Sequence, residues 1–109
     1  MEMIQGGVTA AKGFSAASTE AEIKYKNRTD MAMVFSKEPC TVAGTFTTNV
    51  VKAACVQWDM KIVKESEAVH AVVVNSGIAN ACTGKPGFDA CEATAAAVKE
   101  ALGVGTDTC

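Results

Sequence analysis

The sequence predicts a small α/β fold in which short strands pack against one amphipathic helix. Residues 69–74 (VHAVVV) are short and rich in β-branched side chains, as is typical of a buried strand. Residues 87–102 carry apolar side chains at spacings of three and four, which place them on one face of a helix. A chain of 109 residues without internal repeats or linkers fits one small domain or a piece of a larger one. We therefore treat residues 1–109 as one unit with no internal boundary.

The first half of the chain predicts strands. Residues 6–13 are a glycine-bounded lead-in with one short extended piece, and residues 14–26 permit either a helix or strands. Residues 30–36 predict a strand that ends at a turn over residues 37–39 (KEP). Residues 42–48 (VAGTFTT) predict a second strand. Because the turn between them is short, we expect an antiparallel hairpin.

The second half predicts two helices. Residues 50–58 are expected to be extended, and Asp59 is expected to cap a short helix that ends at Glu67. The apolar face of the helix over residues 87–102 consists of Phe88, Cys91, Ala95, Val98 and Leu102. Gly103 then suits a left-handed helix end. Residues 104–109 lead away from this helix, where another strand would be expected. We therefore predict a partial domain rather than a complete folding unit.

Composition argues against several classes of protein. The formal net charge of -2 gives no attraction to nucleic acid or to an anionic membrane. Apolar runs such as residues 71–74 are far too short to span a bilayer, and the first residues lack the features of a secretion signal. The five cysteines are odd in number and show no CxxC spacing, so we expect free, mostly buried thiols. A cytoplasmic protein is the resulting expectation.

Three familiar kinds of site are not supported, because the sequence lacks residues that each of them requires. A phosphate-binding loop around Gly84-Lys85 would need a glycine at position 79 and Ser or Thr at position 86, which hold Ala79 and Pro86. Cys82 as a nucleophile would need a nearby base, and the one histidine, His70, lies at the far end of the predicted strand. His70 is therefore expected to be structural. The scattered cysteines offer no metal-ligand cluster, so no metal is expected.

The remaining candidate is the polar loop over residues 75–84 (NSGIANACTG). It follows the predicted buried strand and leads into the strongest helix, which is where α/β proteins tend to place sites. Its asparagine, serine and threonine side chains could hydrogen-bond a polar ligand. They could equally hydrogen-bond one another in a rigid connection. The residues alone leave these two alternatives open.

Three segments in this order resemble one family. GGVTAAKGF (residues 6–14), AGTFTTNVVKAA (43–54) and VVVNSGIANACTG (72–84) are similar to the N-terminal part of the glutamate N-acetyltransferase / ornithine acetyltransferase family of arginine biosynthesis. Ala11 and Cys55 stand where that family often has proline, and Ile78 stands where it often has asparagine. These departures argue against Ile78 as a residue that faces the ligand, but they do not argue against the family.

The resemblance implies a layered α/β sandwich, with sheets inside and helices outside, that is completed by a second chain. In that family one precursor cleaves itself before a threonine, which becomes the N-terminal nucleophile of the companion β chain. The threonine carries an acetyl group from N-acetylornithine to glutamate, and some members also accept acetyl-CoA. The implied assembly has two α and two β chains. No cofactor is implied beyond acetyl-CoA as a substrate.

The resemblance places the nucleophile and the oxyanion-hole residues outside this sequence, so we assign no catalytic residue here. Asn75, Ser76 and Asn80 are the expected substrate-facing residues. Two alternatives stay open. One is a noncatalytic structural or interaction module, and the other is a related amidohydrolase or aminopeptidase with the same self-cleaving fold.

Overall fold

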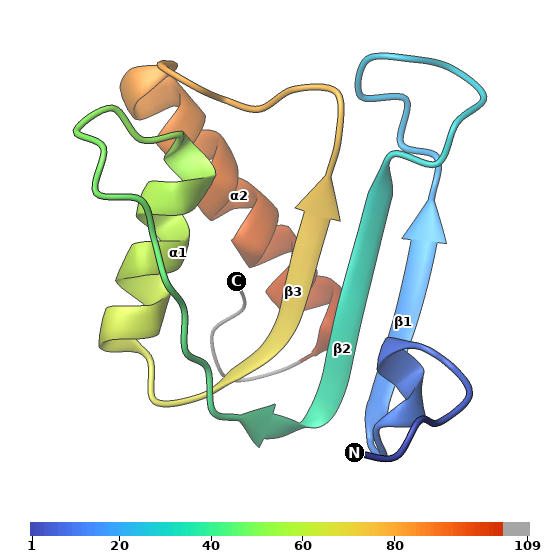
Figure 1. Ribbon diagram of the computed structural model, residues 1–109. Helices are drawn as coiled ribbons and strands as arrows, with labels where there is room; N and C mark the ends of the chain where they lie inside the picture. Colours follow the sequence, from blue (N-terminus) through green and yellow to red (C-terminus); the bar gives the residue numbers. More distant parts are fainter. Residues whose placement is uncertain (104–109) are drawn as a thin grey trace.

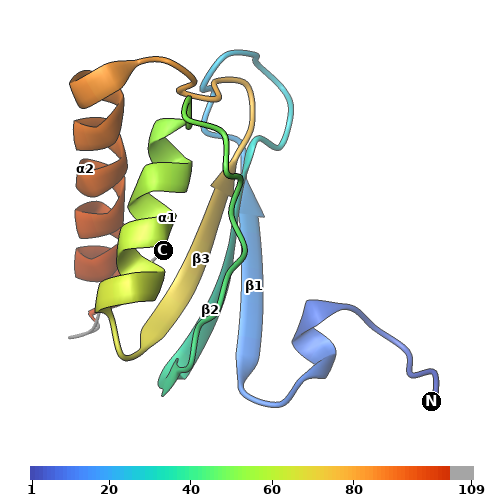
Figure 2. The ribbon, with the colours of Figure 1, turned by 60° about the vertical axis from the view of Figure 1, so that its left-hand side comes forward.

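A computed structural model describes residues 1–103 of the chain. In chain order the elements are a short 3-10 helix η1 (Val8–Ala10), strands β1 (Phe14–Thr19) and β2 (Met31–Cys40), helix α1 (Ala54–Glu65), strand β3 (Val69–Asn75) and helix α2 (Gly84–Leu102). The strands form one antiparallel sheet in the order β1-β2-β3. Both helices lie on the same face of this sheet (Figures 1 and 2). The predicted α/β class is confirmed.

Strand β1 resolves the ambiguity of residues 14–26. It pairs with β2 from Phe14 opposite Ser36 to Thr19 opposite Met31, and a loop over residues 20–30 connects the two strands. All six residues of β1 are exposed. The preceding lead-in contains the 3-10 turn η1 instead of an extended piece, because the Ala10 N–H donates to the Gly7 carbonyl at 3.0 Å.

Strand β2 does not end at the predicted turn over residues 37–39 but continues to Cys40. Its register with β3 shifts between Phe35 and Cys40. Pro39 lies in this irregular stretch, where a residue without a backbone N–H is tolerated. The Ser36 carbonyl lies 2.8 Å from Nδ1 of buried His70. His70 is therefore structural, as expected.

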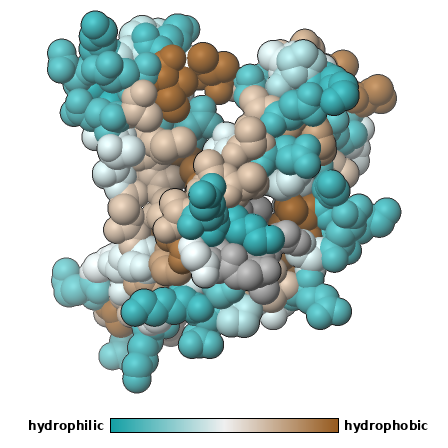
Figure 3. All heavy atoms as spheres, turned by 180° about the vertical axis from the view of Figure 1, so that it is seen from behind, coloured by the Kyte–Doolittle hydropathy of each residue, from teal (hydrophilic) through white to brown (hydrophobic). Residues whose placement is uncertain are grey.

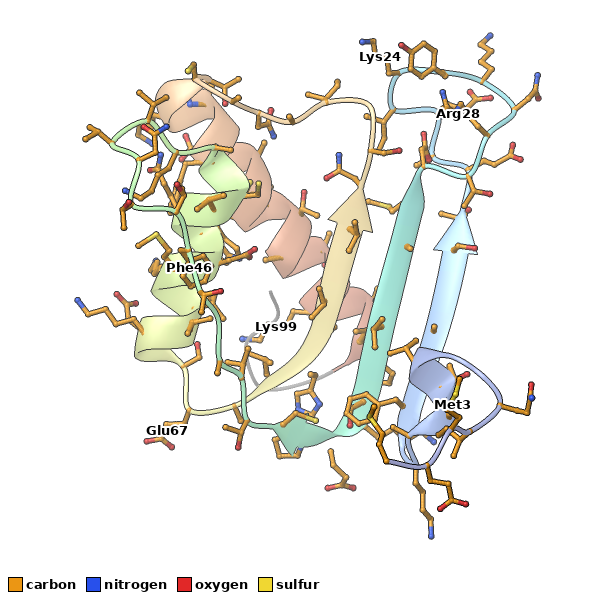
Figure 4. All side chains as sticks on the ribbon, in the orientation of Figure 1. Met3, Lys24, Arg28, Phe46, Glu67 and Lys99 are labelled. Carbon is orange, nitrogen blue, oxygen red and sulfur yellow. The ribbon has the colours of Figure 1, made fainter. Side chains whose placement is uncertain are left out.

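The predicted strand over residues 42–48, and with it the predicted hairpin, is wrong. Both edges of β2 are already occupied, by β1 and by β3, so this segment has no place beside β2. It runs along α1 as irregular chain, with Phe46 over the helix (Figure 4). Directly after this segment, side chains accept backbone N–H groups: Thr47 Oγ1 accepts from Asn49 and Asn49 Oδ1 accepts from Val51. Such local bonds compete with a strand ladder.

Helix α1 begins earlier than predicted and replaces most of the extended segment expected over residues 50–58. Its N-cap is Ala53, and Asp59 lies inside the helix rather than at its start. The Ala54 N–H donates to the Asn80 carbonyl at 3.3 Å, a partner that lies 26 positions away in the sequence. The helix ends at Glu65, where the Ser66 N–H donates to the Ile62 carbonyl at 2.9 Å.

Helix α2 confirms the strongest sequence prediction, although it begins at Gly84 rather than at residue 87. Gly103 adopts the predicted left-handed conformation, with φ 64° and ψ 29°, and its N–H donates to the carbonyls of Lys99 and Glu100. The expectation for residues 104–109 lies outside the described residues. Phe88 meets Trp58 of α1 edge to face, with ring centroids 5.7 Å apart, so the two helices pack against each other.

The core of the described chain is thin. The buried hydrophobic residues are Ala54, Ile62, Val69 and Ala71. Val72 and Val74 are exposed, and hydrophobic side chains reach the surface in several places (Figure 3). The four described cysteines are free, as expected, but none is fully buried. The expectation of mostly buried thiols is wrong because so little of this part of the chain is enclosed.

Gly87→Ala tests the contact between the helices. Alanine normally favours a helix over glycine. Here an added Cβ would collide with the Thr83 side chain and lie 3.3 Å from Ala54 Cβ. We expect the substitution to lower the stability by about 1–3 kcal/mol, as overpacking does, measured by thermal unfolding. An unchanged or raised melting temperature would contradict this close packing.

Candidate functional site

A cavity of about 390 Å³ lies between the sheet and the helix pair. Its walls come from six parts of the described chain. The strands contribute Met31, Val73 and Asn75, and the loop over residues 20–30 contributes Ile23. The remaining lining residues come from α1, from the β3–α2 loop and from α2, and they are Cys55, Trp58, Asp59, Ile78, Asn80, Ala90, Cys91, Thr94, Ala95 and Val98. Most of this wall is apolar, which is typical of small-molecule sites.

The β3–α2 loop, residues 76–83, forms one end of the cavity. Asn75, Ile78 and Asn80 line the cavity, whereas Ser76 does not. Several residues of this part of the chain have positive φ angles, among them Gly77 at 101° and Asn80 at 51°. At Gly77 a Cβ would come within 3.0 Å of Lys24 Cβ, so glycine permits close contact with the 20–30 loop. The structure thus brings together two of the three predicted residues.

Hydrogen bonds make this loop rigid. Asn75 Nδ2 donates to the Ile78 carbonyl at 3.3 Å. The Asn80 carbonyl accepts from Thr83 Oγ1 at 2.9 Å as well as from the Ala54 N–H of α1. The loop therefore contains the internal bonds of a rigid connection, while Asn80 of the loop and Asn75 at the end of β3 both line the cavity. The assignment of Asn75, Ser76 and Asn80 to substrate binding stays a prediction.

Asp30 holds the neighbouring loop in place. Its carboxylate accepts the N–H groups of Ala21 at 2.7 Å and Ile23 at 2.9 Å, and its carbonyl accepts the Ser76 N–H at 2.9 Å. The two side-chain bonds, from Ala21 first, hold the pKa of Asp30 below its usual value. Since Ile23 lines the cavity, Asp30 fixes one part of the wall directly.

The same 20–30 loop also carries a small cationic group. Lys24 Nζ lies 5.3 Å and Arg28 Cζ 5.1 Å from the centre of the Tyr25 ring, so both cations contact one aromatic side chain. Figure 4 shows this group at the outer end of the loop. None of these three residues lines the cavity. The basic cluster is therefore part of the loop surface.

Asp59 is the cavity residue that sequence analysis misassigned. It was expected to cap a helix, but it lies in the middle of α1 and faces the cavity. Burial raises the pKa of its carboxyl group. Cys91 of α2 shares this wall, and the pKa of its thiol is raised by burial and then by Cys55 and Asp59. A sequence signal for this position was available. An acidic residue follows Trp58 directly and lies about one helical turn after Ala54 and Cys55.

Several other possibilities find no support in the described part of the chain. No group of three or more His, Cys, Asp or Glu residues within positions 1–103 is placed to hold a metal ion. No helix in that range has the length and apolar character needed to cross a membrane. Lys85, once considered for a phosphate loop, forms an exposed ion pair with Asp89 at 2.9 Å on the first turns of α2.

The sequence matches a known family over most of its length. Residues 15–109 fit the ArgJ family. The chain belongs to the ArgJ family. It is 45% identical, over 97% of its length, to the arginine biosynthesis bifunctional protein ArgJ of Gloeobacter violaceus and 54% identical, over 71%, to that of Thermotoga neapolitana. The chain spans 26% and 19% of these two relatives.

Solved structures of ArgJ proteins have the same fold. The arginine biosynthesis bifunctional protein of Bacillus halodurans superimposes with a TM-score of 0.85 at 35% identity, covering 94% of this chain and 56% of that one. Ornithine acetyltransferase of Mycobacterium tuberculosis, solved in complex with ornithine, gives 0.80 at 42% identity, covering 94% and 57%. The resemblance inferred from three sequence segments is confirmed as family membership.

Replacing Asn80 separates its backbone role from its side-chain role in this ArgJ-family chain. The φ angle of 51° suits Asn or Gly but strains alanine by about 1–2 kcal/mol. Asn80→Gly keeps the carbonyl that caps α1 and removes the amide from the cavity. We expect Asn80→Gly to melt close to the native protein and Asn80→Ala to melt lower, by differential scanning calorimetry. Equal melting temperatures for the two variants would exclude this strain.

Acidification tests the hydrogen bonds of Asp30. Because the folded-state pKa lies below the unfolded value, these bonds contribute stability above the unfolded pKa and lose it as the pH falls through the folded pKa. We expect the amides of Ala21 and Ile23 to lose protection over that range and in Asp30→Asn, measured by pH-corrected hydrogen exchange. Asp89→Asn, which removes an exposed carboxylate elsewhere, is the control. Unchanged protection in Asp30→Asn would refute the role of Asp30.

Proposed function

We propose that this chain is the N-terminal part of an acetyltransferase that moves an acetyl group from N-acetylornithine to glutamate in arginine biosynthesis. The observation that carries the proposal is the match of 94% of the chain to an ornithine acetyltransferase solved with ornithine, at 42% identity. Membership of the ArgJ family over residues 15–109 supports the same assignment. The noncatalytic module and the related hydrolase have no comparable support.

The proposed chemistry uses an N-terminal threonine on a companion β chain made from the same precursor. Its hydroxyl oxygen attacks the acetyl carbonyl of N-acetylornithine, while its own α-amino group accepts the hydroxyl proton. The carbon–nitrogen bond then breaks, and the amine of ornithine leaves with a proton. The amine of glutamate attacks the resulting acetyl ester, which yields N-acetylglutamate and restores the threonine hydroxyl. Acetyl-CoA is proposed as an alternative donor.

This chain supplies no catalytic group in the proposed reaction. Its contribution is a rigid wall. Asn75 lies at the end of β3, and the β3–α2 loop, held by Asp30 and bonded to the start of α1, carries Ser76 and Asn80. We assign these three residues to substrate binding. Asn75 and Asn80, which reach the cavity, are the stronger pair. Rigid positioning of substrate groups is itself a large part of catalysis.

The proposed assembly consists of two α and two β chains. The exposed valines of β3 and the fully exposed strand β1 give this chain apolar and backbone surface for such partners. The cytoplasm is the proposed compartment, because the described free cysteines suit a reducing environment.

An acetyl-transfer assay on the assembled protein tests this function. We expect N-acetylornithine and glutamate to give ornithine and N-acetylglutamate, and intact-mass analysis to show an acetyl group on the companion chain. Replacing the N-terminal threonine of that chain with alanine should abolish both signals. Omitting glutamate is the control for hydrolysis. Release of acetate at the same rate as transfer would favour the hydrolase, and no reaction in the assembled protein would favour the noncatalytic module.

A further inference from the structure

We propose that Cys55 of α1 and Cys91 of α2 form an oxidation site, at which a peroxide converts the two thiols into a disulfide that joins the helices beside the cavity. This inference goes beyond the acetyl-transfer proposal, because that reaction gives neither side chain a role. It rests on the position of two free thiols on facing helices.

Helices α1 and α2 approach each other closely near the two cysteines. They lie side by side and run in the same direction (Figures 1 and 2). An added Cβ at Gly87 of α2 would lie 3.3 Å from Ala54 Cβ of α1. A disulfide joins residues whose Cβ atoms are about 3.5–4.5 Å apart. The two backbones therefore come close enough at this contact for a bridge between the helices.

The sequence places one cysteine beside each residue of this contact. Cys55 directly follows Ala54 in α1. Cys91 follows Gly87 by four positions, so both lie on the face of α2 that is turned toward α1. Both thiols line the same cavity. Since Cys55 stands where the family often has proline, the pair is a feature of this chain rather than of the family pattern.

The ionisation of Cys91 agrees with this placement. Burial raises the pKa of its thiol, and the negative charges of Cys55 and then of Asp59 raise that pKa further. Cys55 and Asp59 are four residues apart, so they share one face of α1. Because both act on the same thiol, Cys91 lies opposite that face.

The other described cysteines are placed differently. Cys40 lies at the end of β2, where its thiol donates to the Glu38 carbonyl at 3.4 Å. Cys82 is exposed in the β3–α2 loop and does not line the cavity. Of the four cysteines within residues 1–103, only Cys55 and Cys91 share a cavity wall.

The proposed oxidation has two balanced steps. Cys55 is the exposed thiol, so it meets hydrogen peroxide first. Its thiolate attacks one peroxide oxygen, the O–O bond breaks, and Cys55 becomes a sulfenic acid as hydroxide leaves. The Cys91 thiolate then attacks the sulfenic sulfur, which forms the S–S bond and displaces a second hydroxide. Each hydroxide takes up the proton that one thiol lost, so the two thiols are oxidised and one peroxide is reduced to water.

This chemistry suits the different surroundings of the two thiols. Because its pKa is raised, Cys91 has a smaller thiolate fraction and reacts slowly with reagents in solution. An attack on a neighbouring sulfenic acid is intramolecular and needs no encounter with such a reagent. The exposed thiol is therefore assigned the first step and the half-buried thiol the second. In a reducing compartment the disulfide would be transient, as is usual for redox-sensing cysteines.

Peptide mapping of the assembled protein after treatment with hydrogen peroxide tests the inference. Remaining thiols are blocked with N-ethylmaleimide before digestion. Trypsin together with Asp-N then separates residues 53–58, which contain Cys55, from residues 89–99, which contain Cys91. We expect these two peptides as a cross-linked pair that lacks two hydrogens, is absent without peroxide and is lost on reduction with dithiothreitol.

Two variants identify the partners. Cys91→Ser should abolish the cross-linked pair and leave on Cys55 a sulfenic acid that dimedone traps. Cys82→Ser, which makes the same change at an exposed position of the β3–α2 loop, should leave the pair unchanged.

A cross-link from Cys55 to Cys82 or Cys40 in place of Cys91 would overturn the inference. So would unreacted thiols at both positions, or sulfinic acid on Cys55 without a cross-link. Mapping of the unmodified protein gives these results by itself, so the test holds even if Cys91→Ser fails to fold. Since mapping needs no turnover, loss of acetyl transfer and loss of the cross-link are separate results.

Discussion

The arrangement of the cavity depends on Asp30, because this residue joins three parts of the chain that are distant in sequence. Its backbone N–H bonds the end of β1 at Thr19, its carboxylate holds Ala21 and Ile23, and its carbonyl holds Ser76 after β3. It is also one of the few buried polar residues described. A buried carboxylate is stable only when its lone pairs are satisfied, and here backbone N–H groups satisfy them. The loops over residues 20–30 and 76–83 are consequently fixed side by side at one end of the sheet.

The β3–α2 loop has a second structural task that links it to the helices. Its Asn80 carbonyl receives the first N–H of α1, a group that no side chain caps. The helices contact each other closely where Gly87 approaches Ala54 and where Phe88 meets Trp58. Since small residues and one aromatic pair hold the helices together, space remains between them and the sheet. The cavity occupies that space, and the loop that caps α1 also forms part of its wall.

Local sequence signals were sufficient where an element is defined by its own periodicity. Strand β3 was predicted to within one residue, helix α2 was predicted correctly at its end and three residues late at its start, and Gly103 ends α2 as its lack of a Cβ allows. The three family segments were equally sufficient for membership of the ArgJ family. The strand predicted over residues 42–48 is absent because a composition rich in β-branched residues does not by itself supply a partner strand. The predicted capping role of Asp59 was wrong because an aspartate has the same chemistry at the start of a helix and in its middle. Only the position of the helix start, at Ala54, distinguishes the two.

The sequence by itself determined the α/β class, the final helix, the structural nature of His70 and the family, since each depends on short-range pattern or on a specific motif. Only the tertiary structure decided which strands pair with β2, which residues cap α1 and which side chains meet in the cavity. These outcomes depend on contacts between residues far apart in the chain, such as Asp30 with Ser76 and Ala54 with Asn80. The sequence therefore predicted one part of the candidate site, the polar loop. It did not predict the carboxylate of Asp59, because the place of Asp59 in the cavity depends on how α1 packs against α2.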